Sequence, residues 1–159
     1  MNPGFLMSDL SAIAPPCINE DEYINFLILF LKRNSIKILI PTIDDELQMI
    51  SRRKDEIERS SGALVIVGTC ESISICCDKL LTHYYLEKIR APQPKAIIGG
   101  MEEIQSFIKS GRGIIVKPRF GNGSKGIKIW DNMNLKSLRY DPDKYIYQKF
   151  EKFHKEFTS

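Results

Sequence analysis

The chain has 159 residues, enough for one ordinary domain or two small lobes, and 43% of them are hydrophobic, as in a soluble globular protein. Its formal net charge of +3 is too small to indicate nucleic-acid binding. The longest apolar run, Phe26 to Leu31, is far shorter than the roughly 20 residues that cross a bilayer, and the N-terminus lacks the features of a secretory signal. We therefore expect a cytoplasmic protein that binds neither nucleic acid nor a membrane.

The first half of the chain alternates predicted helices and strands. Asn19-x-x-Glu22 resembles a capping box, and apolar residues at helical spacing follow it. Strand, crossover helix and strand then follow in an order that predicts a parallel βαβ unit. Its predicted elements are a strand over Ile36–Ile40, a charged amphipathic helix over Asp44–Arg59 that ends at Gly62, and a buried strand over Ala63–Val67.

The second half begins with a predicted helix over Glu71–Ile89, and Pro92 and Pro94 then mark a linker. Four cysteines without a C-x-x-C spacing favour reduced thiols over disulfides or a zinc site. Cys76 and His83 share one face of this helix, but no third group activates them as a thiol and base. The remaining predicted elements are a short strand near Lys95–Ile98, a helix over Glu102–Lys109, strands over Ile114–Val116 and Ile127–Asp131, and a strand over Tyr145–Phe150.

Residues 114–130 read IIVKPRFGNGSKGIKIW and contain the spacing G-x-G-x-x-G. A dinucleotide fingerprint needs a helix after the glycines, whereas here polar and apolar residues alternate, which predicts strand, loop and strand. A Walker A loop would need a lysine where Ile127 stands. A protein-kinase flap has its lysine after the loop, and the H-R-D and D-F-G triplets are absent from the sequence.

Two interpretations of this stretch remain, a flexible cover over phosphate groups and an ordinary β-hairpin with a Gly/Ser tip. Glycines expose backbone N–H groups and allow an anion to approach closely, which favours the cover. Lys117 directly follows a buried strand and precedes Pro118, so it is expected to emerge at the edge of the sheet. A fixed cation there would bind a phosphate group more strongly than a lysine in open water.

Five segments, in this order along the chain, resemble ATP-grasp enzymes, particularly the large-subunit type of carbamoyl-phosphate synthase. They are ILIPTIDDEL, CCDKLLTHYYLEKIRAPQP, IIVKPRFGNGSKGIKI, YIYQKF and KEFT. The resemblance implies an α/β fold in two parts. Residues 1–77 would form a partial pre-ATP-grasp domain, a parallel, Rossmann-like βαβ unit, and residues 78–159 the N-terminal α+β lobe and hinge strand of an ATP-grasp domain that is incomplete at its C-terminus.

The resemblance also assigns roles to candidate nucleotide-binding residues. Lys79 and Lys117 resemble the two lysines that reach the phosphates, and Glu156 resembles the carboxylate that binds the ribose hydroxyls. The loop over the β- and γ-phosphates would consist of Gly121, Asn122, Gly123, Ser124 and Gly126. The hinge strand that holds adenine through its backbone would be Gln148, Lys149, Phe150 and Glu151, where family members usually carry Glu in place of Gln148 or Lys149.

The activity implied is ATP-dependent activation of a carboxylate or bicarbonate as an acyl phosphate, which an amine then attacks. Family members bind Mg²⁺ through residues beyond the KEFT segment, near which this chain ends, so we predict no metal or catalytic residue and expect the isolated chain to bind ATP or ADP but to be inactive. The expected partners are the remainder of an ATP-grasp fold or a second copy of the chain. The alternative is a non-catalytic nucleotide- or partner-binding fragment that complements a separate chain carrying the metal site.

Overall fold

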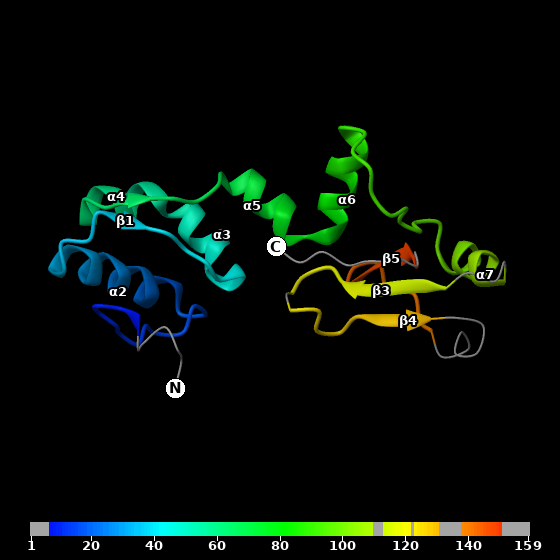
Figure 1. Ribbon diagram of the computed structural model, residues 1–159, viewed down its shortest axis with the longest axis horizontal. Coiled ribbons are helices and arrows are strands. Elements are labelled where there is room, and N and C mark those ends of the chain that lie inside the picture. The colour runs from blue at the N-terminus through cyan, green and yellow to red at the C-terminus, as the bar shows by residue number, and fades with distance from the viewer. Residues whose placement is uncertain (1–6, 110–112, 122, 131–137, 151–159) are drawn as a thin grey trace. The chain divides into compact units, whose positions relative to one another are not determined.

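The computed structural model describes residues 7–109, 113–121, 123–130 and 138–150. The chain divides into two compact units, Met1–Ile73 and Ser74–Ser159 (Figure 1). One unit contains a parallel sheet with helices and the other an antiparallel sheet with helices. This mixed architecture confirms the predicted α/β class. Within the described residues, no helix is both long enough and apolar enough to cross a membrane.

The first unit is a small βαβ arrangement with one preceding helix. Strands β1 and β2 are parallel, with Ile38 opposite Leu64 and Leu39 opposite Val65, which confirms the predicted parallel pairing. Each strand has only two residues, fewer than the sequence pattern predicts. The elements of this unit are α2 (Glu20–Arg33), β1 (Ile38–Leu39), α3 (Asp44–Arg52), α4 (Lys54–Ser61) and β2 (Leu64–Val65).

The core of the first unit lies between its helices and one face of the sheet. Val65 is fully buried on that face, whereas Ile38 and Leu64 are 54% and 52% exposed. The helices therefore cover only one side of the two strands. The core residues come from α2, α3, α4 and the segment that contains β2, and they are Tyr23, Ile24, Leu31, Met49, Ile50, Ile57, Ala63 and Val65.

Two local predictions for this unit are wrong. The continuous helix over Asp44–Arg59 is two helices that meet at Arg53, where ψ is 15°, and the Arg53 side chain forms ion pairs with Glu56 and Asp21 at this junction. Asn19 does precede α2, but its side chain donates to Glu22 (3.1 Å) and accepts no backbone hydrogen bond, so the capping box is not formed. Gly62 does end α4, with φ of +74°.

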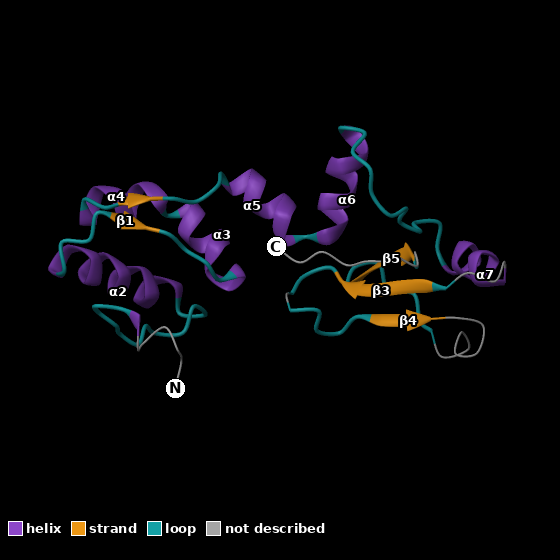
Figure 2. Cartoon of the chain, in the orientation of Figure 1, coloured by secondary structure: helices purple, strands orange, loops and turns teal. Residues whose placement is uncertain are grey.

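The second unit contains a three-stranded antiparallel sheet in the order β4-β3-β5 (Figure 2). The central strand β3 pairs with both neighbours, so Ile114 lies opposite Trp130 on one side and Lys149 on the other. The strands are β3 (Ile114–Pro118), β4 (Lys128–Trp130) and β5 (Tyr145–Lys149). The helices are α6 (Lys79–Lys88), α7 (Met101–Lys109) and α5 (Cys70–Cys77), which spans the division between the two units.

The predicted helix over Glu71–Ile89 is also two helices. Asp78 interrupts it with extended backbone angles, and its carboxylate accepts a hydrogen bond from the Leu80 amide (2.9 Å), so it caps α6. An N-cap residue needs this extended conformation, because its side chain must turn back to the first helical turn. The predicted strand near Lys95–Ile98 is reduced to a single bridge between Ala96 and Gln148. Helix α7 (Met101–Lys109) confirms the helix predicted over Glu102–Lys109.

The core of the second unit lies where α7 packs against the sheet. Ile104 and Ile108 of α7 and Ile114 of β3 are completely buried. Since this core holds the first residues of β3, the strand's far end, at Lys117 and Pro118, has a fixed direction. The cluster consists of Ile97, Ile104, Ile108, Ile114, Val116, Leu138 and Tyr147.

Candidate functional site

The glycine-rich stretch forms the connection of an antiparallel hairpin between β3 and β4, which confirms the predicted order of strand, loop and strand. Three glycines of the loop have positive φ angles: 111° at Gly121, 61° at Gly123 and 77° at Gly126. Ser124 also has a positive φ, of 57°. Such angles favour glycine strongly, because a side chain would clash with the backbone. The glycines therefore allow the backbone path of this loop.

The glycines differ in what surrounds them. A Cβ atom on Gly126 would lie 2.9 Å from Cγ of Pro118, so this glycine allows the loop to pack against the end of β3. A Cβ atom on Gly121 or Gly123 would have no atom within 4 Å. The loop is thus closely packed at its base and open at its tip, where a ligand could approach the backbone.

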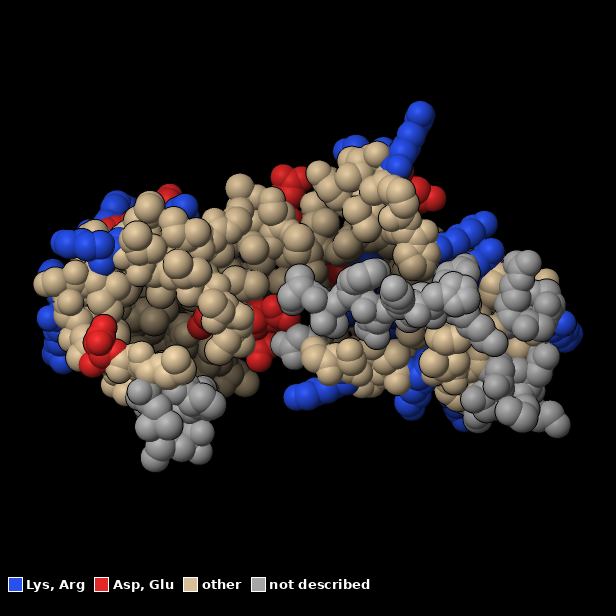
Figure 3. Space-filling view, in the orientation of Figure 1, with Lys and Arg blue, Asp and Glu red and all other residues tan. Residues whose placement is uncertain are grey.

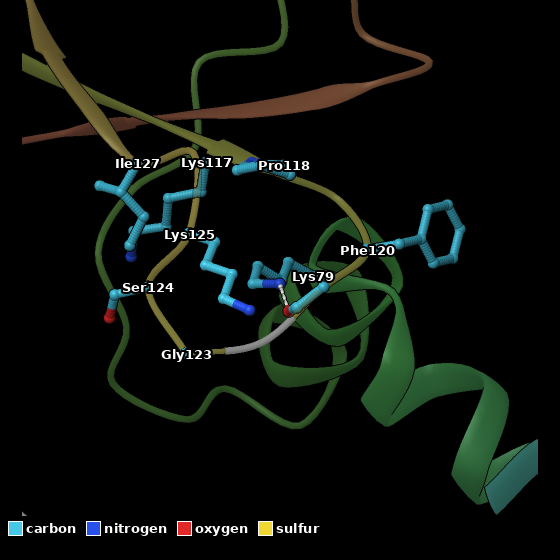
Figure 4. A pocket seen from close by; sticks show the side chains of 9 residues that line it. Lys79, Lys117, Pro118, Phe120, Gly123, Ser124, Lys125 and Ile127 are labelled. Carbon is cyan, nitrogen blue, oxygen red and sulfur yellow. Dashed lines mark hydrogen bonds between the residues drawn. The ribbon is translucent and has the colours of Figure 1, made fainter. Parts of the chain in front are cut away.

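A pocket of about 230 Å³ lies beneath this loop. Lys79 of α6, Lys117 of β3 and Lys125 of the loop all line it, and Figure 4 shows Lys79 and Lys125 extending into the space that the loop encloses, with Lys117 on the side of the loop where Ile127 lies. The fold therefore brings three lysines from different elements to one site. The lining residues are Lys79, Lys117, Pro118, Phe120, Gly121, Gly123, Ser124, Lys125 and Ile127.

The two lysines predicted from the sequence have different surroundings. The Lys79 ammonium donates to the Gly121 carbonyl oxygen (2.7 Å), which ties it to the loop. Lys117 is half-buried, and its ammonium has no hydrogen-bond or ion-pair partner among the described residues. Burial, and then the positive charge of Lys79, lower the pKa of Lys117. A half-buried, unpaired ammonium is unfavourable, so an anion bound beside it would be stabilised.

Lys125 is a site residue that the sequence analysis did not identify. It stands between Ser124 and Gly126, inside the glycine spacing, and it lines the pocket. The available signal was a basic residue within a loop already considered for phosphate binding.

The two units differ in charge. Basic residues outnumber acidic ones from Ser74 onward, whereas acidic residues outnumber basic ones before it. Basic side chains also predominate on the visible face of the second unit (Figure 3).

A second pocket, of about 300 Å³, shares Lys79 and Lys117 with the first. Gln148 of β5 contributes to its wall, and the Gln148 side-chain amide donates to the Pro94 carbonyl (3.4 Å). His83 of α6 is buried there, and its Nδ1 atom has no hydrogen-bond partner among the described residues. The lining residues are Cys76, Lys79, Thr82, His83, Leu86, Gln93, Pro94, Lys117 and Gln148.

Two other residues predicted for the hinge, Lys149 and Phe150, do not line these pockets. The Lys149 ammonium lies over the Phe107 ring, 4.8 Å from its centroid, so this side chain is directed to α7. The amides of Lys149 and Phe150 donate to the carbonyls of Lys95 (3.1 Å) and Gly113 (3.0 Å), and both amides are thus already used within the chain. Three predicted site residues, Asn122, Glu151 and Glu156, lie outside the described residues.

The chemistry of the site follows from its charges. Two of its three lysines extend from regular elements, and the loop above them has open backbone around Gly121 and Gly123. Ammonium groups and exposed backbone amides together bind multiply charged anions such as polyphosphates. In the part of the chain that the structure describes, no group of three or more His, Cys, Asp or Glu residues could hold a metal ion.

Comparisons with known proteins agree with the fold and with the motifs. Residues 2–66 match the family model of the PylC-like N-terminal domain. Over 109 residues the chain is 25% identical to a carbamoyl-phosphate synthase of Methanobrevibacter smithii, and this match covers 68% of the chain and 30% of that protein.

Solved structures of ATP-grasp proteins share the fold. The N5-carboxyaminoimidazole ribonucleotide synthetase of Thermotoga maritima has a TM-score of 0.54 at 15% identity, over 83% of this chain and 32% of that one. The biotin carboxylase domain dimer of Hydrogenobacter thermophilus 2-oxoglutarate carboxylase, solved with MgADP, ADP and bicarbonate, has a TM-score of 0.58 at 17% identity, over 91% of this chain and 35% of that one.

Pyruvate carboxylase of Rhizobium etli has a TM-score of 0.54 at 13% identity, over 90% of this chain and 13% of that one. The chain therefore spans about a third or less of the length of these relatives. Together, the comparisons confirm that the chain resembles ATP-grasp proteins, including carbamoyl-phosphate synthase.

Proposed function

We propose that this chain is the ATP-binding portion of an ATP-grasp ligase of the carbamoyl-phosphate-synthase type. Such an enzyme activates a carboxylate or bicarbonate as an acyl phosphate, which an amine then attacks. The observation that carries the proposal is the pocket beneath the glycine-rich loop, which Lys79, Lys117 and Lys125 all line. The similarity to carbamoyl-phosphate synthase supports the same class of reaction.

In this proposal, the three lysines bind the phosphate chain of ATP. In phosphoryl transfer the protein contributes mainly by positioning the phosphates and stabilising their charge. Lys117 is suited to this role because it extends from β3, which the core of the second unit holds in place, and Lys79 extends from the first turn of α6. The loop would cover the phosphates and exclude water from them.

The second pocket is the proposed site of the nucleoside. It adjoins the first through Lys79 and Lys117, and Gln148 lies in its wall. Magnesium is expected for ATP-grasp enzymes in general, but the described residues contain no group of carboxylates that would hold it. The roles proposed here therefore use only lysine side chains, backbone amides and the pocket walls.

Isothermal titration calorimetry of the purified chain with ATP tests the proposal. We expect weak binding of ATP and ADP that does not depend strongly on magnesium. GTP should bind more weakly if backbone groups of the hinge other than the paired amides of Lys149 and Phe150 read adenine, because guanine presents the opposite hydrogen-bonding pattern. If millimolar ATP gives neither heat nor a thermal shift, the nucleotide site does not exist. GTP that competes as well as ATP would argue against adenine recognition by the hinge.

A second measurement separates catalysis from binding alone. Phosphate release from ATP is followed with and without bicarbonate or a panel of amino acids. A release that depends on the carboxylate supports the ligase reaction. ATP binding without any such release favours the alternative function, a non-catalytic nucleotide- or partner-binding fragment that complements a separate chain.

A further inference from the structure

An ion pair joins the base of the glycine-rich loop to the start of α6. Arg119 comes two residues after Lys117, and Asp78 comes directly before Lys79. Nε of Arg119 donates to one carboxylate oxygen of Asp78 (3.1 Å), and Nη2 donates to the other. The Asp78 side chain is only 4% exposed and that of Arg119 19%. A two-pronged contact of this kind fixes both the distance and the orientation of its partners.

Backbone hydrogen bonds place Arg119 between three segments. Its carbonyl accepts from the Lys79 amide (3.0 Å), and its own amide donates to the Lys144 carbonyl (2.9 Å). Its Nη1 atom also donates to the Pro142 carbonyl (3.3 Å). Arg119 therefore links the end of β3 to the first residue of α6 and to the turn before β5.

The two phosphate lysines repel each other in the absence of an anion. The charge of Lys79 contributes to the lowered pKa of Lys117, after the effect of burial. Lys79 is the first residue of α6, and its ammonium donates to Gly121 of the loop. The position of this ammonium thus depends both on where α6 begins and on where the loop leaves β3, and the ion pair connects these two points.

We propose that the ion pair of Asp78 and Arg119 is a positioning pair, which holds Lys79 beside Lys117 and orients the loop to receive a nucleoside polyphosphate. The inference rests on the proposed ATP site. Neither Asp78 nor Arg119 lines the pocket beneath the loop, so the pair acts through the lysines and not by touching the ligand.

The test uses variants of the pair in the full chain, titrated with ATP and with adenosine. Arg119→Met removes the donors, Arg119→Lys keeps the charge but loses the two-pronged geometry, and Asp78→Asn keeps an oxygen that can cap α6 but loses the charge. We expect each variant to lower ATP affinity roughly tenfold and to leave adenosine affinity unchanged. The double variant Asp78→Asn/Arg119→Met should be no worse than either single variant, because both remove the same interaction.

Arg139→Met is the matched control, since Arg139 is an exposed arginine of the same unit whose side chain has no hydrogen bond or ion pair among the described residues. It should bind ATP like the parent. Circular dichroism and melting temperatures show whether each variant folds. If Arg119→Met does not fold, the test relies on Arg119→Lys.

Three outcomes are decisive against the inference. If folded Arg119→Met and Arg119→Lys bind ATP as tightly as the parent, the pair does not position the lysines. If ATP and adenosine affinities fall equally, the pair has only a general structural role. If the parent binds neither ATP nor adenosine measurably, the proposed function fails and the inference fails with it. The titration of the parent alone distinguishes this outcome from the first two.

Discussion

Lys117 combines burial, a lowered pKa and the lack of a partner among the described residues, and this combination makes it the most sensitive residue of the site. We predict that Lys117→Met keeps the fold, because the methionine side chain can cover the same strand end. It should lose a charge-assisted contact of about 1.5–3 kcal/mol, which is about a tenfold to hundredfold loss of ATP affinity. Calorimetric titration measures this. Lys88→Met, at an exposed lysine of α6, is the control and should bind like the parent.

The lowered pKa of Lys117 predicts that ATP binding is linked to proton uptake. Because the pKa of free Lys117 is lowered, a fraction of its amine is neutral at alkaline pH. A polyphosphate beside it favours the charged form and raises the pKa, so binding should take up a proton. We expect the apparent binding enthalpy at about pH 9 to depend on the ionisation enthalpy of the buffer, in the direction of proton uptake. Lys117→Met should weaken this dependence, since Lys79 and Lys125 remain in the pocket, and a buffer-independent enthalpy for the parent would contradict the prediction.

Among single residues, some members of the site can be predicted from the sequence and others cannot. Lys117 is predictable because a buried strand and a proline bracket it. Arg119 lies two residues away and has no local pattern of its own, since its partner Asp78 is 41 residues distant along the chain. An interaction between two such residues depends on how α6 meets the end of β3, which no spacing in the sequence encodes.

The glycine-rich loop is the element whose backbone conformation is most constrained. Gly123 has a φ of 61° and open space around it. We predict that Gly123→Val lowers ATP affinity about tenfold or more, because a β-branched residue avoids this conformation at a cost of about 1–2 kcal/mol. The melting temperature of the free protein should change little, since the loop tip makes few contacts. Thermal melts and ATP titrations of the same sample measure both effects.

Ser124→Gly is the opposite change at the neighbouring residue, which already has a positive φ without being glycine. It should leave ATP affinity equal to the parent's or improve it slightly. If Gly123→Val binds ATP as well as the parent, the loop is an ordinary turn and does not cover the phosphates.

Predicted elements differ from observed ones where a polar side chain interrupts a pattern. The apolar spacing over Glu71–Ile89 is continuous through Asp78, yet Asp78 ends one helix and caps the next. Arg53 similarly separates α3 from α4. Periodicity records which face of a helix is buried, and both halves of a broken helix can keep the same face, so the break leaves no trace in the pattern.

At the scale of the whole molecule, the chain consists of two units with separate cores. The order of the five sequence segments was sufficient to indicate the ATP-grasp resemblance. The pockets could not be derived in this way, since α6, the linker at Pro94, β3 and β5 must come together to form them.

Every residue that lines the two proposed nucleotide pockets comes from the second unit. We therefore predict that ATP slows hydrogen exchange in peptides that cover the start of α6, β3 and the glycine-rich loop, and leaves the peptides of α2, α3 and α4 unchanged. At a hundredfold excess over the dissociation constant, a ligand stabilises its site by about 2.7 kcal/mol, so exchange that requires release of ATP should slow about a hundredfold. Mass spectrometry of the exchanging protein measures this peptide by peptide. Lys117→Met at the same ATP concentration should show much less protection, whereas equal protection of both units would mean that ATP acts on the chain elsewhere.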